Sequence, residues 1–249
     1  MVRLRPISHD DELSVLGHLD ELRFRLIVSL TIFAAALALC LWQNHLLLQV
    51  VNAPLGGRRP ITFGVTEPFT ATFTVAAYAA LVLTLPFLLY QLYAYLLPAL
   101  SPAERRMALP LLLLAPVLFV GGVSFGYFVI LPVALHFLLH FNQHQFNVQI
   151  RARDWYAFFG ITMLAAGLVF QVPVAILAAT RLGITTPQKL RKKRRQAIVV
   201  CAVIAAALPG VDPVSMLVEL VPLIALYELS ILLASAFGAP RARPVVDSP

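Results

Sequence analysis

The sequence predicts an all-α membrane protein with six transmembrane helices and both termini in the cytoplasm. The 249-residue chain is 60% hydrophobic and only 12% charged, whereas soluble domains are about 25% charged. Its apolar residues are gathered in long runs, and most of its basic residues lie in the short segments between them. A mean hydropathy of +0.84 agrees with a chain that crosses a membrane several times.

Six apolar runs are candidate spans, since a transmembrane helix needs about 20 predominantly apolar residues. They are residues 24–43, 71–97, 108–139, 155–180, 197–210 and 214–237. The third contains Pro110, Pro116 and Pro132, each of which can kink a helix. The fifth is short, because Ala197 to Pro209 is 13 residues, or about 20 Å of helix against a hydrocarbon core of about 30 Å. We therefore expect kinked helices and short last two spans.

The segment RLGITTPQKLRKKRR, residues 181–195, indicates the orientation. It holds seven of the 19 basic residues, and a Lys or Arg in mid-membrane costs about 2.5–3.5 kcal/mol. Six spans would place 15 basic residues on the side of the two termini. The other side would have 4, namely Arg58, Arg59, Arg151 and Arg153. Positively charged loops stay in the cytoplasm, so this asymmetry predicts both termini there. The net charge of +7 does not indicate nucleic-acid binding, because the charges lie in short loops.

The chain divides into three parts by pattern. Residues 1–23 are expected to form a cytoplasmic N-terminal amphipathic segment, because leucines recur there every three or four residues. The simplest interpretation of this segment is a membrane-surface anchor with solvated charges. Residues 24–237 form a single six-helix domain, and residues 238–249 are expected to be a flexible cytoplasmic tail. Residues 44–70 and 140–154 would be outer loops, and the several prolines and glycines of the first suit turns and short irregular caps.

Two patterns that suggest chemistry have simpler explanations. GVSFG, residues 122–126, matches the nucleophile elbow of hydrolases, but it lies within an apolar helix, and no base for Ser124 is evident. Its two glycines also form GxxxG, a motif for close helix packing, which is the interpretation we favour. His136, His140 and His144 share one helical face, but no Cys, Asp or Glu of that segment completes a metal site. We therefore expect no metal and no cofactor. Cys40 and Cys201 both lie inside apolar runs and are interpreted as small core residues, so we expect no disulfide.

Several polar residues lie within or beside the spans, where such groups are costly and often functional. Gln171 lies in the middle of the fourth span, next to Pro173. Glu219 and Glu228 are nine residues apart in the sixth span, so they should face different neighbours. Glu104 is the only acid of the first cytoplasmic loop, beside two arginines. It could pair with one of them, or it could bind a cationic partner.

Taken together, these segments resemble the TatC family, the large integral subunit of the twin-arginine protein translocase. The resemblance extends from about residue 10 to residue 237. It rests on HLDELRFR (18–25), APL (53–55), EPF (67–69), PFLLYQ (86–91), PAL (98–100), ERR (104–106), VPVAI (172–176), GITTP (183–187), LRKKR (190–194) and Asp212. The agreement of order and spacing makes this set specific, although no single piece is decisive.

The resemblance implies a concave six-helix protein of the cytoplasmic (inner) membrane with both termini in the cytoplasm. It implies binding of twin-arginine signal peptides, work with TatA-type and TatB-type single-span subunits, self-association in a larger complex, and export of folded proteins by the proton-motive force. By motif, the signal-peptide-binding residues are Glu21, Arg23, Arg25, Tyr95, Leu100, Glu104 and Arg105. Further functional positions are Pro54, Gln171, Asp212 and Glu219.

Gln171 departs from the family pattern, which often has a glutamate at this position. An amide keeps the size and the hydrogen bonding of glutamate but cannot be charged. We hypothesise that Glu219, in a neighbouring span, supplies a polar contact instead.

Two other classes of function remain as alternatives. A secondary transporter of a small solute would explain proline-broken spans and buried acids, but it predicts two similar halves, which the sequence lacks. An intramembrane protease would need a base for Ser124. The chain has no nucleotide-binding loop, no HExxH and no cofactor fingerprint, so we expect that it is not an enzyme.

Overall fold

The computed structural model describes residues 15–96, 102–145, 148–181, 184–207 and 213–237. Over this part of the chain the structure is almost entirely helical, as predicted. Its elements are α1 (Val15–Trp42), α2 (Asn44–Asn52), η1 (Ala53–Leu55), α3 (Glu67–Leu96), α4 (Pro102–Phe125), the π-helical turn η3 (Gly126–Ile130), α5 (Leu131–His140), α6 (Ala152–Val169), α7 (Val172–Arg181), α8 (Pro187–Lys192), α9 (Arg194–Ala207) and α10 (Pro213–Phe237).

Five helical segments among the described residues are long and apolar enough to cross a membrane. They are Leu19–Trp42, Glu67–Tyr95, Leu113–His140, Ala152–Arg181 and Pro213–Ala236. They correspond to the first four predicted spans and the sixth. The predicted fifth span corresponds to α9, which has 14 residues and is therefore about 21 Å long at 1.5 Å per residue. Its shortness was predicted, and residues 208–212 lie outside the described part. The sixth span was also expected to be short, but it corresponds to α10, which has 25 residues because its apolar run is long enough for a full span.

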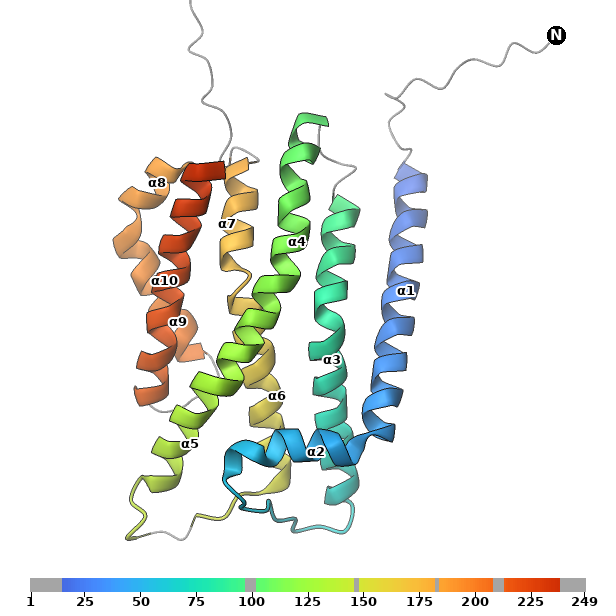
Figure 1. The fold of residues 1–249 in the computed structure, drawn as a ribbon, viewed down its shortest axis with the longest axis vertical. Helices are drawn as coiled ribbons and strands as arrows, with labels where there is room; N and C mark the ends of the chain where they lie inside the picture. Colours follow the sequence, from blue (N-terminus) through green and yellow to red (C-terminus); the bar gives the residue numbers. More distant parts are fainter. Residues whose placement is uncertain (1–14, 97–101, 146–147, 182–183, 208–212, 238–249) are drawn as a thin grey trace, which may run out of the picture.

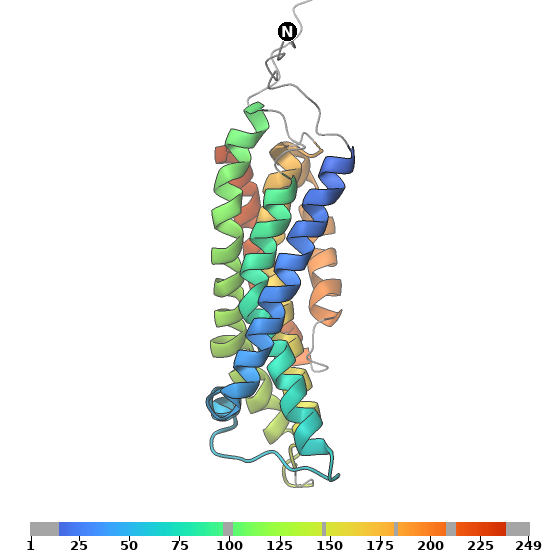
Figure 2. The same ribbon diagram turned by 90° about the vertical axis from the view of Figure 1, so that its right-hand side faces the viewer.

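The helices run lengthwise and give the bundle two different ends (Figure 1). At one end, which we call the basic end, α1 and α4 begin, α3, α7 and α10 end, and α8 carries three basic residues, Lys189, Arg191 and Lys192. At the other, the cap end, α2 lies across the bundle (Figure 1). The view turned by 90° shows the same lengthwise arrangement of helices (Figure 2).

The core lies between α3, α6 and the α4–η3–α5 segment, with Trp155, Leu131 and Val75 among its buried residues. A second cluster joins α4, α7 and α10 through Ala115, Val174 and Ala234. In contrast, α1 packs mainly against α3 and stands at the edge of the bundle (Figure 1). Its exposed leucines and isoleucines face outward, where lipid would cover them.

Glycines allow the closest helix contacts. A Cβ atom added at Gly122 would lie 2.6 Å from the carbonyl oxygen of Ala166, and one at Gly126 would lie 3.0 Å from the Cβ of Ala166. The packing interpretation of GVSFG is therefore confirmed. Ser124 is exposed, and its hydroxyl donates to the carbonyl of Val120 in its own helix, an arrangement that offers no support for a nucleophile.

One expectation about secondary structure was wrong. Residues 44–70 were expected to be irregular, but residues 44–52 form α2, because the run LLLQVV can pack one apolar face on the core through Val51. The fourth span is present as predicted, and it is interrupted where Phe170 and Gln171 separate α6 from α7. Pro173 explains the break, because it has no N–H to continue the hydrogen-bond ladder.

Two other predicted helices are also present. The third span bends through η3, whose π-helical turn precedes Pro132, and π-turns are a known accommodation within helices. The N-terminal segment was expected to be a helix that runs into the first span, and α1 extends without interruption from Val15 to Trp42. Residues 1–14 lie outside the described residues.

Candidate functional site

At the basic end, Glu21, Arg25 and Gln91 form a polar group that we call the boundary cluster. The Nε and Nη2 atoms of Arg25 donate to Oε1 of Glu21, at 2.9 and 2.6 Å. Its Nη1 atom donates to Oε1 of Gln91, at 2.6 Å. The first contact is made within α1, one helical turn apart, and the second joins α1 to α3. Arg25 therefore holds the carboxylate of Glu21 and connects two helices.

Four of the other predicted signal-peptide residues, Arg23, Tyr95, Glu104 and Arg105, belong to helices that begin or end at the same end. Arg23 is exposed on α1, and Tyr95 is half-buried near the end of α3. Glu104 and Arg105 lie in the first turn of α4, but their side chains are outside the described part of the structure. Leu100 also lies outside it. The starts of α1 and α4 and the end of α3 share one end of the bundle (Figure 1), so the fold brings these segments to the same side.

In the middle of the bundle, Gln171 stabilises the break between α6 and α7. Its backbone N–H donates to the carbonyl of Leu168, at 2.9 Å, which leaves the carbonyl of Gly167 without its usual donor four residues later. The Nε2 atom of Gln171 donates to that carbonyl, at 3.4 Å, and to the carbonyl of Ala115 in α4, at 3.1 Å. The side chain therefore replaces a lost helical hydrogen bond and ties the break to α4.

The two acids of α10 have different surroundings, as their spacing predicted. Glu219 is buried, with 2% exposed, while Glu228 is exposed and pairs with Arg194 of α9, at 2.7 Å. Among the described residues, Glu219 is not a hydrogen-bond partner of Gln171, whose amide donates to Ala115 and Gly167. The hypothesised polar contact from Glu219 to this position is therefore not a hydrogen bond in the structure. Asp212 lies outside the described residues.

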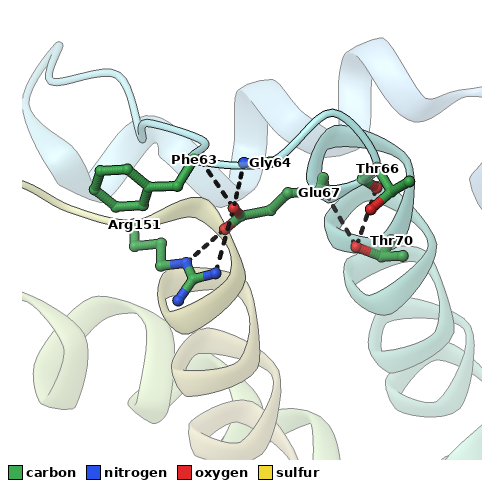
Figure 3. Close-up of polar contacts among 6 residues, drawn as sticks. All are labelled: Phe63, Gly64, Thr66, Glu67, Thr70 and Arg151. Atoms are coloured by element: carbon green, nitrogen blue, oxygen red, sulfur yellow. Dashed lines mark hydrogen bonds and ion pairs between the residues drawn. The ribbon is translucent and has the colours of Figure 1, made fainter.

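The cap end contains an ion pair that the sequence alone did not reveal (Figure 3). Glu67 is 5% exposed, and its Oε1 accepts from Nε of Arg151, at 2.7 Å. Its Oε2 accepts from the backbone N–H groups of Phe63 and Gly64, at 2.9 and 3.3 Å. The hydrogen bond and the charge of Glu67 raise the pKa of Arg151. In the sequence, the only indication of this ion pair was the glutamate of the EPF motif, residues 67–69.

This ion pair joins the two segments that close the cap end. Ile61 donates its N–H to the carbonyl of Ile150 and accepts from the N–H of Ala152, both at 2.8 Å. An open cleft of about 630 Å³ lies beside the pair, lined in part by Thr66, Thr70 and Arg153. Since the contacts are made by loops far apart in the sequence, the cap end is a cross-linked structure and not a set of independent loops.

Pro54 lies in the short helix η1 beside a second set of cap contacts. The indole N–H of Trp155 donates to Oδ1 of Asn52, at 3.1 Å, and Nδ2 of Asn52 donates to the hydroxyl of Tyr156, at 3.4 Å. The hydroxyl of Tyr127 donates to the carbonyl of Val50, at 3.0 Å. These contacts fix the segment that carries Pro54 to α6 and to η3. Sequence reasoning did not find Asn52, because a lone Asn at the end of an apolar run is common.

The histidines do not form a metal site in the described part of the chain. The rings of His136 and His140 are tilted by 30° to each other with their centroids 4.6 Å apart, and Nδ1 of His140 lies 2.7 Å from the carbonyl oxygen of His136. Among the described residues, no group of three or more His, Cys, Asp and Glu residues is placed to hold a metal ion.

Replacing Arg151 with leucine should lower the melting temperature of the purified protein, because Glu67 would remain buried without its cationic partner. The matched control is Arg194→Leu, which breaks an ion pair whose side chains are 51% and 41% exposed. Exposed pairs contribute about 0–1 kcal/mol, so this change should have little effect. Thermal unfolding in detergent measures both variants. Equal losses would contradict a special role for the Glu67–Arg151 pair.

Comparison with known proteins agrees with this structure. The sequence model of the family described as Sec-independent protein translocase protein (TatC) matches residues 17–222. Proteins named Sec-independent protein translocase protein TatC from Deinococcus radiodurans and TatCd from Bacillus subtilis are 33% and 30% identical to this chain. The alignments cover 88% and 93% of this chain, and 85% and 96% of the relatives.

Two solved structures have the same fold. A crystal structure titled twin arginine translocase receptor TatC has a TM-score of 0.72 and 30% identity, and the match covers 88% of this chain and 99% of that one. A second, of the same receptor in DDM, has a TM-score of 0.75 and 31% identity, over 87% of this chain and 98% of the other. With the family match extending from α1 into α10, these likenesses show that the chain is a multi-pass membrane protein of the TatC family, a component of the Sec-independent protein translocase.

Proposed function

We propose that this chain is the signal-peptide-recognising core subunit of a twin-arginine translocase, which exports folded proteins across the cytoplasmic membrane using the proton-motive force. The observation that carries the proposal is the family match over residues 17–222. In this role the chain binds and transmits but does not catalyse a chemical reaction, so we do not propose an enzyme.

The basic end would face the cytoplasm. The 15-to-4 distribution of basic residues between the two sides supports this orientation, and α8 adds Lys189, Arg191 and Lys192 to the same end as the start of α1. Signal peptides would then approach the starts of α1 and α4 from the cytoplasm. The cap end, with its Glu67–Arg151 pair, would face outward.

Recognition would depend on carboxylates at the cytoplasmic boundary of the membrane. Two guanidinium groups of the signal peptide need anionic partners, and partial desolvation strengthens charge-assisted bonds there. Glu21 and Glu104 supply the charges, while Arg23, Arg25, Tyr95, Leu100 and Arg105 complete the proposed surface. The planar fork of arginine makes two parallel bonds that lysine cannot reproduce, which would explain a preference for paired arginines.

The partners would be twin-arginine signal peptides, TatA-type and TatB-type single-span subunits, and further copies of this chain. The edge position of α1 leaves much of its apolar surface available to lipid or to another helix. Polar groups within the membrane, here Gln171 and Glu219, are natural sites for contacts between helices. Pro54 and Asp212 would act at the outer side.

Site-specific photo-crosslinking tests the proposal. A photoreactive residue would replace Leu22, which is 43% exposed next to Glu21, in membranes that contain a precursor with an Arg-Arg signal peptide or its Lys-Lys counterpart. A photoreactive residue in place of Val65, which is 100% exposed at the cap end, is the control. We expect crosslinks from position 22 to the Arg-Arg precursor alone. Equal crosslinking from position 65, or none from position 22, would contradict the proposed site.

The two carboxylates should contribute measurably to affinity. Hydrogen bonds to charged groups are worth about 1.5–3 kcal/mol, so Glu104→Ala should weaken binding of an Arg-Arg peptide by about 10- to 100-fold. Glu21→Ala should weaken it less, because Arg25 already engages this carboxylate. Peptide titration of the purified protein measures both effects. Unchanged affinity in both variants would refute the assignment of these residues.

A further inference from the structure

The geometry of the boundary cluster assigns Arg25 a role of its own. We infer that its guanidinium group binds the Glu21 carboxylate when no ligand is present, and that the guanidinium group of a ligand must displace Arg25 from it. The inference rests on the proposed function, since it concerns the same carboxylate. Within the proposed surface, Arg25 would set the affinity of the site by competing for Glu21, and it would not itself bond to the arginines of the signal peptide.

The contacts resemble those that a bound arginine would make. Two N–H groups of Arg25 converge on Oε1 of Glu21, at 2.9 and 2.6 Å, and the two side chains are only 23% and 27% exposed. This is the charge-assisted pairing that a peptide guanidinium would seek. A second guanidinium at the same oxygen would meet both an occupied acceptor and the positive charge of Arg25.

Gln91 provides the partner that makes displacement feasible. Its Oε1 accepts from Nη1 of Arg25, at 2.6 Å, and it belongs to α3, whereas Glu21 and Arg25 belong to α1. When a ligand takes the carboxylate, Arg25 can keep this hydrogen bond and need not be left without a partner near the membrane. Arg25 is thus held between two acceptors, one of which a ligand can take over.

Displacement has a definite thermodynamic consequence. A conformational step that precedes binding divides the affinity of every ligand by the same factor. Arg-Arg and Lys-Lys peptides would both bind less tightly than to an unoccupied Glu21, and their ratio of affinities would be unchanged. For a weakly binding peptide, the apparent Kd would rise above the concentration of the peptide, so that little would bind. A tightly binding peptide would still bind. Arg25 would therefore act as a threshold against weakly bound cationic peptides.

Titration of the full-length protein in detergent with fluorescent Arg-Arg and Lys-Lys signal peptides tests this inference. We expect Arg25→Gln to raise both affinities by about three- to tenfold, with the ratio unchanged. Gln91→Leu is the matched variant, because it keeps the charge of Arg25 but removes the acceptor that Arg25 would retain after displacement. It should lower both affinities, which the loss of a positive charge could not explain.

Three results would overturn the inference. Weaker binding in Arg25→Gln would mean that Arg25 only positions Glu21. A rise in Arg25→Gln without a fall in Gln91→Leu would mean that charge alone is responsible. If the wild-type protein binds neither peptide, or if Glu21→Gln leaves Arg-Arg binding unchanged, the proposed function of Glu21 fails first. Should Arg25→Gln unfold, Gln91→Leu alone decides the matter.

Discussion

Replacing Gly122 with valine is expected to lower the melting temperature of the protein strongly, whereas the same replacement at Gly121 is expected to be tolerated. A Cβ atom at Gly122 would lie 2.6 Å from the carbonyl oxygen of Ala166 and 2.8 Å from Cγ of Phe170. At Gly121, no atom lies within 4 Å of the added Cβ. The two glycines are adjacent in α4, so the pair separates packing from any general effect of valine in this helix.

The loss of stability on replacing Gly122 should be large, because the added Cβ atom would clash with a backbone atom. A side chain can rotate to admit a methyl group, but the carbonyl of Ala166 is fixed within α6, so the two helices must move apart. Overpacking typically costs about 1–3 kcal/mol and sometimes more. For a chain of this size, that corresponds to a shift of roughly 2–12 °C in melting temperature.

Thermal unfolding in detergent, followed by the fluorescence of Trp42 and Trp155, provides the measurement. Gly122→Ala should give a smaller loss than Gly122→Val, because it adds only the first carbon. Since Phe170 lies in the break between α6 and α7, the Gly122 variant should also reduce transport in cells. Similar melting temperatures for the valine variants at positions 121 and 122 would contradict this account of the α4–α6 contact.

The spans could be predicted from the sequence because their signal is large and local. Composition and apolar runs are enough to locate helices 20 or more residues long, and the GxxxG pattern identified a true contact of α4 with α6. The shortness of α9 could be read from the run that begins at Ala197. In each case the property belongs to a continuous stretch of chain, so no knowledge of tertiary neighbours was needed.

Two other features depend on tertiary neighbours and could not be predicted. Arg25 was identified as a site residue, but its contact with Gln91 links residues 66 positions apart, and one sequence gives no sign of such a pairing. The Glu67–Arg151 pair spans 84 positions. The break at Gln171 is an intermediate case, because Pro173 made a kink possible, whereas the way in which the amide repairs it depends on the proximity of Ala115 in α4.

The second large effect is expected at Gln171, where replacement with leucine should destabilise the protein by about 1–3 kcal/mol, the usual cost of leaving a buried polar group without its partner. The Nε2 atom serves the carbonyls of Ala115 and Gly167, and leucine offers no donor to either. Because the side chain joins α4 to the break between α6 and α7, its loss should also weaken transport.

Thr162→Val is the matched control for Gln171→Leu. Thr162 is 2% exposed in α6, and its hydroxyl has no hydrogen-bond partner in the described part of the structure. Replacing it with an apolar group of the same shape should therefore leave stability unchanged or raise it. Both changes remove one buried polar group from the same membrane-spanning segment, so a difference between them reports the hydrogen bonds made by Gln171 and not polarity alone.

Gln171→Glu distinguishes hydrogen bonding from charge at this position. An ionised carboxylate has no donor, and it would face the two carbonyl oxygens that the amide now serves, while a protonated carboxyl group could donate to only one of them. We therefore expect a stability between those of wild type and Gln171→Leu, measured by thermal unfolding in detergent. A glutamate variant as stable as wild type would show that the break between α6 and α7 does not need both amide hydrogen bonds.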